Sequence, residues 1–306
     1  MRPVAEQVDD WYRPGAQPVP SLAEAQVYCR ELTTSHYENF PLVSCLLPKR
    51  LHQHFYNVYA FCRWADDLGD EIGDAQRSLE LLGWWRNELS ACFAGESRHP
   101  VFVALSPTIE QFGIPLQPFA DLISAFEQDQ TVVEYDTYEQ LLDYCTRSAD
   151  PVGRIVLYLC ECFDEDNAAL SDSICTGLQL ANFWQDVSRD LDIGRIYLPA
   201  EDRDHFGVTH KGLQSKKSTG EFAQLMEFEV RRARELLQAG LPLVKRLPGR
   251  LQVDIELFAR GGLRILERVE SIGYRVLEQR PVVTKFDAVR LLLPCVVRAL
   301  LRRITP

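Results

Sequence analysis

Positive charge is scarce in this chain. Lys and Arg number 33 against 44 Asp and Glu, so the 306 residues carry a formal net charge of −11, with a pI near 5.1. A protein that binds nucleic acid through the phosphate backbone needs a basic surface. The composition therefore argues against a nucleic-acid partner.

Paired metal-ligand motifs are also missing. The nine cysteines form no Cys-x-x-Cys pair, and the six histidines show no His-x-x-x-His spacing, which argues against a zinc site. The cysteine count is odd and most of these residues fall on apolar faces. We therefore expect reduced thiols in the core of a cytoplasmic protein.

Long hydrophobic runs are absent as well. No run approaches the roughly 18 apolar residues of a membrane span, and no apolar signal core follows the initial Met-Arg-Pro. The segment 286–304 holds leucines, valines and four arginines but almost no acid. We expect either a packing helix or peripheral contact with the inner face of an anionic membrane.

Helical periodicity dominates what the chain does contain. Apolar residues recur every third or fourth position, and no convincing alternating strand is found. We expect one all-α domain over 1–306, a helical bundle with an extended N-terminal arm at 1–20. The expected helices lie near 21–35, 49–71, 75–94, 99–112, 116–130, 136–149, 152–165, 168–192, 219–247, 250–279 and 284–303.

Two acidic motifs carry oxygen-bearing side chains at helical spacing, about 120 residues apart. The first contains Arg63, Asp66, Asp67 and Asp70, and the second contains Gln179, Asn182, Asp186, Arg189 and Asp190. Two carboxylates about 6 Å apart in a partly buried site repel by about 3 kcal/mol, and a cation is the simplest compensation. A solvated acidic face is the alternative, but the neighbours of both motifs are apolar and aromatic. We predict that the motifs bind Mg²⁺, and through it substrate phosphates.

Two irregular stretches accompany these motifs. Asp150-Pro151 interrupts a helical pattern, so we expect the helix to end or kink there. The stretch 192–220 is rich in charge and glycine, and long loops of this kind are often lids. Its opening residues Arg195 and Tyr197 could place a cation and a phenol over bound phosphate.

The motifs resemble those of the squalene/phytoene synthase family. The matching stretches, between about residues 30 and 280, are Tyr59–Asp70, Tyr144-Cys145, Pro151–Gly153, Gln179–Asp190 and Arg195–Pro199. The resemblance implies an isoprenoid-synthase helical bundle with a central apolar channel, and Mg²⁺-assisted departure of diphosphate from a prenyl substrate. It also implies metal ligation by Asp66, Asp70, Asn182, Asp186 and Asp190, diphosphate contacts from Arg63, Gln179 and Arg195, and Tyr144 facing the reacting carbons.

Within the family, the chain is most similar to the hydroxysqualene synthase branch. The likeness rests on His36–Pro41, Leu46–Pro48, Arg147–Gly153 and Phe183–Val187. Family members that condense two prenyl diphosphates usually carry small hydroxyl residues where Tyr37 and Asn39 stand, and Arg where Gln185 stands. Fewer phosphate-binding groups suit an enzyme that holds one diphosphate. The branch implies conversion of presqualene diphosphate and water to hydroxysqualene, which needs no reductant.

The remaining expectations concern substrate contacts and alternatives. Further substrate-binding residues are expected at His36, Tyr37, Asn39, Phe40, Asn182, Arg189 and Tyr197. Enzymes acting before and after this step in squalene biosynthesis are potential partners. The alternatives are a synthase that condenses farnesyl or geranylgeranyl diphosphate, a non-catalytic scaffold and a lipid-carrying helical binder. A condensing synthase would turn over the C15 or C20 diphosphate alone. A scaffold would have lost the metal carboxylates, and a lipid binder would not depend on Mg²⁺.

Overall fold

The structure is a computed structural model, and it describes residues 2–12, 17–35, 48–249 and 251–282. Throughout these ranges the chain is helical, with no β-strand beyond one isolated parallel bridge between Glu134 and Ile196. The all-α class is therefore confirmed. In the same ranges, no helix is long and apolar enough to cross a membrane. The predicted substrate residues His36, Tyr37, Asn39 and Phe40, and the segment 286–304, lie outside the described residues.

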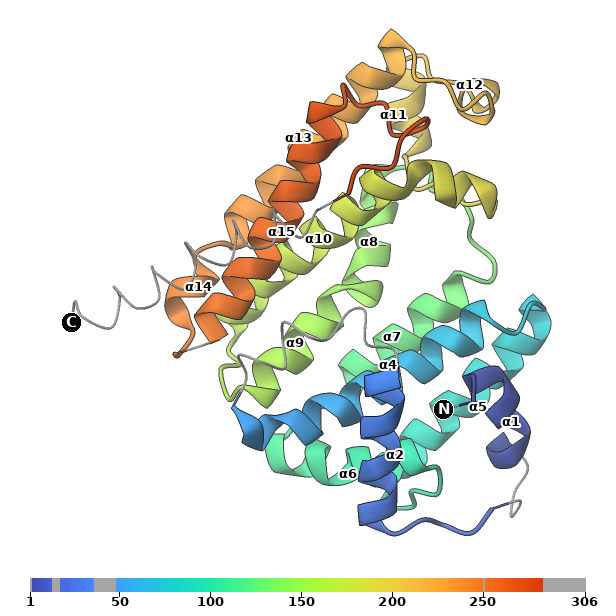
Figure 1. Cartoon of the computed structure of the whole chain (residues 1–306), viewed down its shortest axis with the longest axis vertical. Coiled ribbons are helices and arrows are strands. Elements are labelled where there is room, and N and C mark those ends of the chain that lie inside the picture. Colours follow the sequence, from blue (N-terminus) through green and yellow to red (C-terminus); the bar gives the residue numbers. More distant parts are fainter. Residues whose placement is uncertain (1, 13–16, 36–47, 250, 283–306) are drawn as a thin grey trace. The chain divides into compact units, whose positions relative to one another are not determined.

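The chain divides into two compact units. Figure 1 colours the chain along its sequence, from blue at the N-terminus to red at the C-terminus. The first comprises Met1–Val132 and Arg154–Phe163, and the second comprises Val133–Gly153 and Asp164–Pro306. Helix α9 (Asp150–Leu159) begins in the second unit and ends in the first. The prediction of a single domain remains a prediction.

The first unit is built around helix α4 (His52–Asp70), which packs against most of its neighbours. The other helices of this unit are α1 (Val4–Tyr12), α2 (Leu22–Ser35), η1 (Lys49–Leu51), α5 (Ala75–Phe93), α6 (Pro100–Phe112) and α7 (Leu116–Gln128). An aromatic core lies at its centre, where the Trp64 ring stacks on Trp85 at 5.2 Å. The N-terminal arm expected to be extended instead forms α1, because its helical face buries Val4 and Val8.

The second unit is centred on the long helix α10 (Glu165–Asp192), against which α13 and α15 pack (Figure 1). Its other helices are α8 (Tyr138–Ser148), α11 (Ala200–His205), α12 (His210–Gln214), α13 (Gly220–Gly240), α14 (Leu243–Arg246) and α15 (Leu251–Ser271). The α10 and α13 backbones approach closely at Gly240, where an added Cβ would lie 2.7 Å from the carbonyl oxygen of Leu170. Glycine allows this contact because it lacks that atom.

Both irregular stretches are visible in the structure. The helix breaks at Ala149, one residue before Asp150, as the following proline predicted. The Asp150 carboxylate is buried and accepts a hydrogen bond from the Thr176 hydroxyl at 2.8 Å. The stretch 192–220 is not the long loop expected, because it contains α11 and α12.

Candidate functional site

The first acidic motif occupies the C-terminal end of α4. Asp66, Asp67 and Asp70 belong to its last turns and Glu71 is its C-cap, with no basic residue in the last turn. The C-terminus of a helix carries the negative end of the macrodipole, so carboxylates there are unfavourable. Electrostatics alone would not place these four groups together, which points to a use for their charge.

Arg63 offsets much of this negative charge. Its guanidinium forms ion pairs with Asp67, with Asp66 at 3.4 Å and with Glu71 at 3.0 Å. Asp67 is buried, and burial raises its pKa to about 7 although the positive charge of Arg63 opposes the shift. Asp66 and Asp70 are more exposed. Arg63 Nε is buried and has no hydrogen-bond partner among the described residues, so it can serve an additional acceptor.

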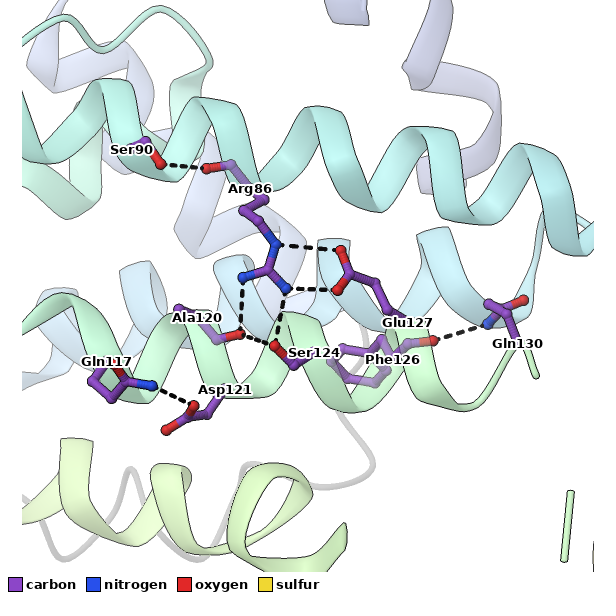
Figure 2. Close-up of polar contacts among 9 residues, drawn as sticks. All are labelled: Arg86, Ser90, Gln117, Ala120, Asp121, Ser124, Phe126, Glu127 and Gln130. Carbon is purple, nitrogen blue, oxygen red and sulfur yellow. Dashed lines mark hydrogen bonds and ion pairs between the residues drawn. The ribbon is translucent and has the colours of Figure 1, made fainter. Parts of the chain in front are cut away.

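The end of α4 is fixed by side chains from two other helical regions. The Gly69 carbonyl accepts hydrogen bonds from Gln130 Nε2 at 3.1 Å and from the Ser78 hydroxyl at 3.4 Å. Gln130 Nε2 also donates to the Phe126 carbonyl, and α7 is attached to α5 by Arg86, as Figure 2 shows. These bonds satisfy a helix-end carbonyl that has no partner within its own helix.

The second motif lies in the C-terminal half of α10. Gln179, Asn182, Asp186 and Arg189 share one face at three- and four-residue spacing, and Asp190 flanks it. Burial, together with the nearby negative charge of Asp186, raises the pKa of Asp190 to about 7, although the positive charge of Arg195 opposes the shift. A cation at this end of α10 would relieve the repulsion between the two carboxylates.

Arg280 also contacts this motif. Its Nε and Nη2 donate to the two carboxylate oxygens of Asp186 at 2.5 and 2.9 Å. The adjacent Pro281 carbonyl accepts a hydrogen bond from the buried Gln185 Nε2 at 2.6 Å. The segment after α15 is therefore held on α10 at a predicted metal ligand.

An aromatic cluster lies beside the second motif. Tyr197 stacks on Phe183 with ring centroids 3.8 Å apart, and Tyr144 lies 6.3 to 6.4 Å from both rings. Tyr135 completes the cluster, 5.5 Å from Tyr144. A small pocket next to it is lined by Asp190, Arg195 and Tyr197 together with apolar side chains. Arg195, Tyr197, Tyr144 and Asp190 are thus gathered within one unit.

The predicted site residues are divided between the two units. Arg63, Asp66 and Asp70 lie in the first, and the second contains Tyr144, Gln179, Asn182, Asp186, Arg189, Asp190, Arg195 and Tyr197. Within the described residues, no three His, Cys, Asp or Glu side chains are close enough to hold a metal ion. The donor types nevertheless suit Mg²⁺, because carboxylate and amide oxygens are its preferred protein ligands. The metal and substrate roles of these residues remain predictions.

Several contacts around the motifs were missed by sequence reasoning. Gln130, Ser78 and Arg280 touch the motifs through hydrogen bonds or ion pairs. Gln130 and Arg280 lie far from the residues they contact in sequence, and Ser78 belongs to the next helix, α5. None belongs to a spacing pattern that signals chemistry.

Known proteins share this sequence and fold. The squalene/phytoene synthase family matches residues 33–287. A 15-cis-phytoene synthase from Synechocystis sp. is 32% identical over 286 residues, which cover 88% of this chain and 84% of the relative. A hydroxysqualene synthase from Rhodopseudomonas palustris is 31% identical over 251 residues, which cover 79% of this chain and 84% of that relative. The crystal structure of squalene synthase HpnC from Alicyclobacillus acidocaldarius is 45% identical with a TM-score of 0.80, covering 83% of this chain and 95% of that one.

These matches span most of the chain and include both acidic motifs. They agree with the all-α architecture and with the motif resemblance found in the sequence. The chain belongs to the squalene/phytoene synthase family.

Proposed function

We propose that this chain catalyses the Mg²⁺-dependent conversion of presqualene diphosphate and water to hydroxysqualene and diphosphate. The main observation in favour of this reaction, over condensation of two prenyl diphosphates, is the state of Gln185. Gln185 is a neutral amide, so it offers no positive charge to a second diphosphate, and its buried side chain is already engaged in a hydrogen bond to the Pro281 carbonyl. The relatives named hydroxysqualene synthase and squalene synthase HpnC support the same choice.

The proposed ligands and contacts are those of the two motifs. Asp66, Asp70, Asn182, Asp186 and Asp190 would hold Mg²⁺, which when bound supplies charge that stabilises the departing diphosphate. Arg63 and Arg195 supply further positive charge to the same leaving group, and the free Nε–H of Arg63 suits an anionic oxygen. Gln179, Arg189 and Tyr197 are the proposed additional substrate contacts.

The proposed reaction passes through a carbocation that the aromatic cluster would have to stabilise. The carbon–oxygen bond to diphosphate breaks and the electron pair leaves with the diphosphate. The resulting carbocation rearranges, and a water oxygen then forms the new carbon–oxygen bond while releasing a proton. The faces of Tyr144, Phe183 and Tyr197 can stabilise the cation during this interval, because aromatic rings present negative charge at their faces.

A product analysis tests the proposal. Purified protein with Mg²⁺ and no NADPH is incubated with presqualene diphosphate, or in parallel with farnesyl diphosphate. We expect hydroxysqualene from the first reaction and no product from the second, and chelation of the metal with EDTA should stop turnover. Consumption of farnesyl diphosphate would refute the assignment.

A condensing synthase is the second candidate, and the similarity to relatives named phytoene synthase favours it. In that case a C15 or C20 diphosphate should be consumed without presqualene diphosphate being supplied. The same assay with geranylgeranyl diphosphate as a third substrate distinguishes the two functions.

A further inference from the structure

The segment that carries Arg195 and Tyr197 is attached to the segment before α8. The Ile196 amide donates to the Val133 carbonyl at 2.7 Å, and the Ala200 amide donates to the Tyr135 carbonyl at 2.9 Å. The parallel bridge between Glu134 and Ile196 lies between these bonds. Two irregular segments therefore align over several residues without forming a sheet.

Arg203, on α11, joins the two segments through its side chain. Its Nε donates to the Leu198 carbonyl at 3.0 Å, and its Nη2 forms an ion pair with Glu134. Arg203 is only 4% exposed, and His210 Nε2 lies 3.1 Å from the same Glu134 carboxylate. One buried guanidinium thus contacts a carbonyl of one segment and a carboxylate of the other.

The ion pair between Arg203 and Glu134 lies next to the aromatic cluster in sequence. Leu198 follows Tyr197, which stacks on Phe183, and Glu134 precedes Tyr135, whose ring lies 6.0 Å from Tyr197. Both ends of the Arg203–Glu134 link therefore adjoin aromatic residues of the cluster. Arg195 is separated from Leu198 by only two residues and lines the pocket next to Asp190.

We propose that Arg203, held by Glu134, is a positioning residue that fixes Arg195 and Tyr197 for binding a diphosphate group. The inference rests on the proposed function only in requiring a diphosphate-bearing substrate. Arginine suits the task because its planar fork donates in two directions at once, whereas lysine offers a single flexible ammonium group. Arg203 itself does not touch substrate in this scheme.

Hydrogen exchange measured by mass spectrometry is the primary test, on full-length wild type, Arg203→Gln, Arg203→Lys and Glu134→Gln. We expect the amides of Ile196 and Ala200 to exchange at least about tenfold faster in Arg203→Gln, with a smaller increase in Arg203→Lys because the charge is kept. The control is Arg234→Gln. It breaks the 2.8 Å ion pair of Arg234 with Glu270, between α13 and α15, and should leave these amides unchanged.

Calorimetric binding of inorganic pyrophosphate with Mg²⁺ is the second readout. We expect about tenfold weaker binding for Arg203→Gln, equivalent to about 1.4 kcal/mol, and no change for Arg234→Gln. Unchanged exchange at residues 196–200 in a folded Arg203→Gln protein would overturn the inference, as would pyrophosphate affinity equal to wild type. If both effects appear but wild type does not convert presqualene diphosphate, the positioning role stands and the proposed reaction fails.

Discussion

Glu229 should make the stability of this protein fall as the pH rises toward neutrality. The side chain lies on α13 and is fully buried, and its Oε2 has no hydrogen-bond partner among the described residues. Burial, together with the negative charge of Asp202, raises its pKa to about 9. Arg232, 3.5 Å away, opposes it and also lies over the Tyr138 ring. The protonated form is therefore the one that the folded state favours.

The magnitude follows from proton linkage. The pKa of Glu229 in the folded protein lies above its usual value of 4.5. Protonated Glu229 therefore makes its full contribution to folding stability below about pH 4.5, and this contribution is lost as the pH rises through about 9. Between about pH 5.5 and about pH 7.5 the unfolded chain has released this proton and the folded protein has kept it. The free energy of unfolding should then fall by about 3 kcal/mol over that interval, because the folded protein holds one proton more than the unfolded chain.

Urea unfolding of wild type and Glu229→Gln across this pH interval measures the effect. The difference in unfolding free energy between the two proteins should change by about 3 kcal/mol in favour of the variant as the pH rises. Glu235→Gln makes the same substitution on the exposed face of α13, and its difference from wild type should change far less over this interval. A flat difference for Glu229→Gln as well would refute the reasoning.

Two further substitutions test packing and hydrogen bonding in the same unit. Gly240→Ala should destabilise the protein by about 2 kcal/mol because its Cβ would press on the Leu170 carbonyl, whereas Gly261→Ala, with open space around its Cβ, should stabilise it by about 0.5 to 1 kcal/mol. Thermal and urea unfolding would contradict this if the two changes had the same sign. Asp150→Asn should be nearly neutral because an amide oxygen can accept the Thr176 bond, while Asp150→Ala should cost about 1 to 3 kcal/mol. If Asp150→Asn and Asp150→Ala lost the same unfolding free energy, the hydrogen bond from Thr176 would not be the cause of the destabilisation.

Much of the fold was predictable because apolar spacing is a local signal. The limits of α5 and α6 came within one residue, and Pro151 marked the break at Ala149. The helix predicted over 49–71 begins with the 3-10 turn η1, and α4 itself starts at His52. The helix predicted over 250–279 ends at Ser271, because Gly273 and Tyr274 adopt left-handed conformations. The helix predicted to reach 165 ends at Leu159, near another left-handed residue, Glu161. Non-glycine residues in that conformation give no sequence warning.

Helical spacing alone could indicate the candidate site residues that share a helix. The spacing of Asp66, Asp70, Asp186 and Asp190 is readable on α4 and α10 without any tertiary information. Arg203 and Gln130 act through single contacts with distant segments, which periodicity cannot reveal. Helix α1 was missed for the same reason, because it is short and burial of Val4 and Val8 decides its structure.

The four carboxylates at the end of α4 have a consequence for how this protein can evolve. They form a locally frustrated patch, in which the charge pattern conflicts with the helix that carries it and Arg63 only partly resolves the conflict. Substitutions that neutralise Asp66 or Asp70 should therefore be among the easiest ways to gain stability and the most damaging to activity. A lineage released from selection for catalysis would therefore be expected to lose these acids early.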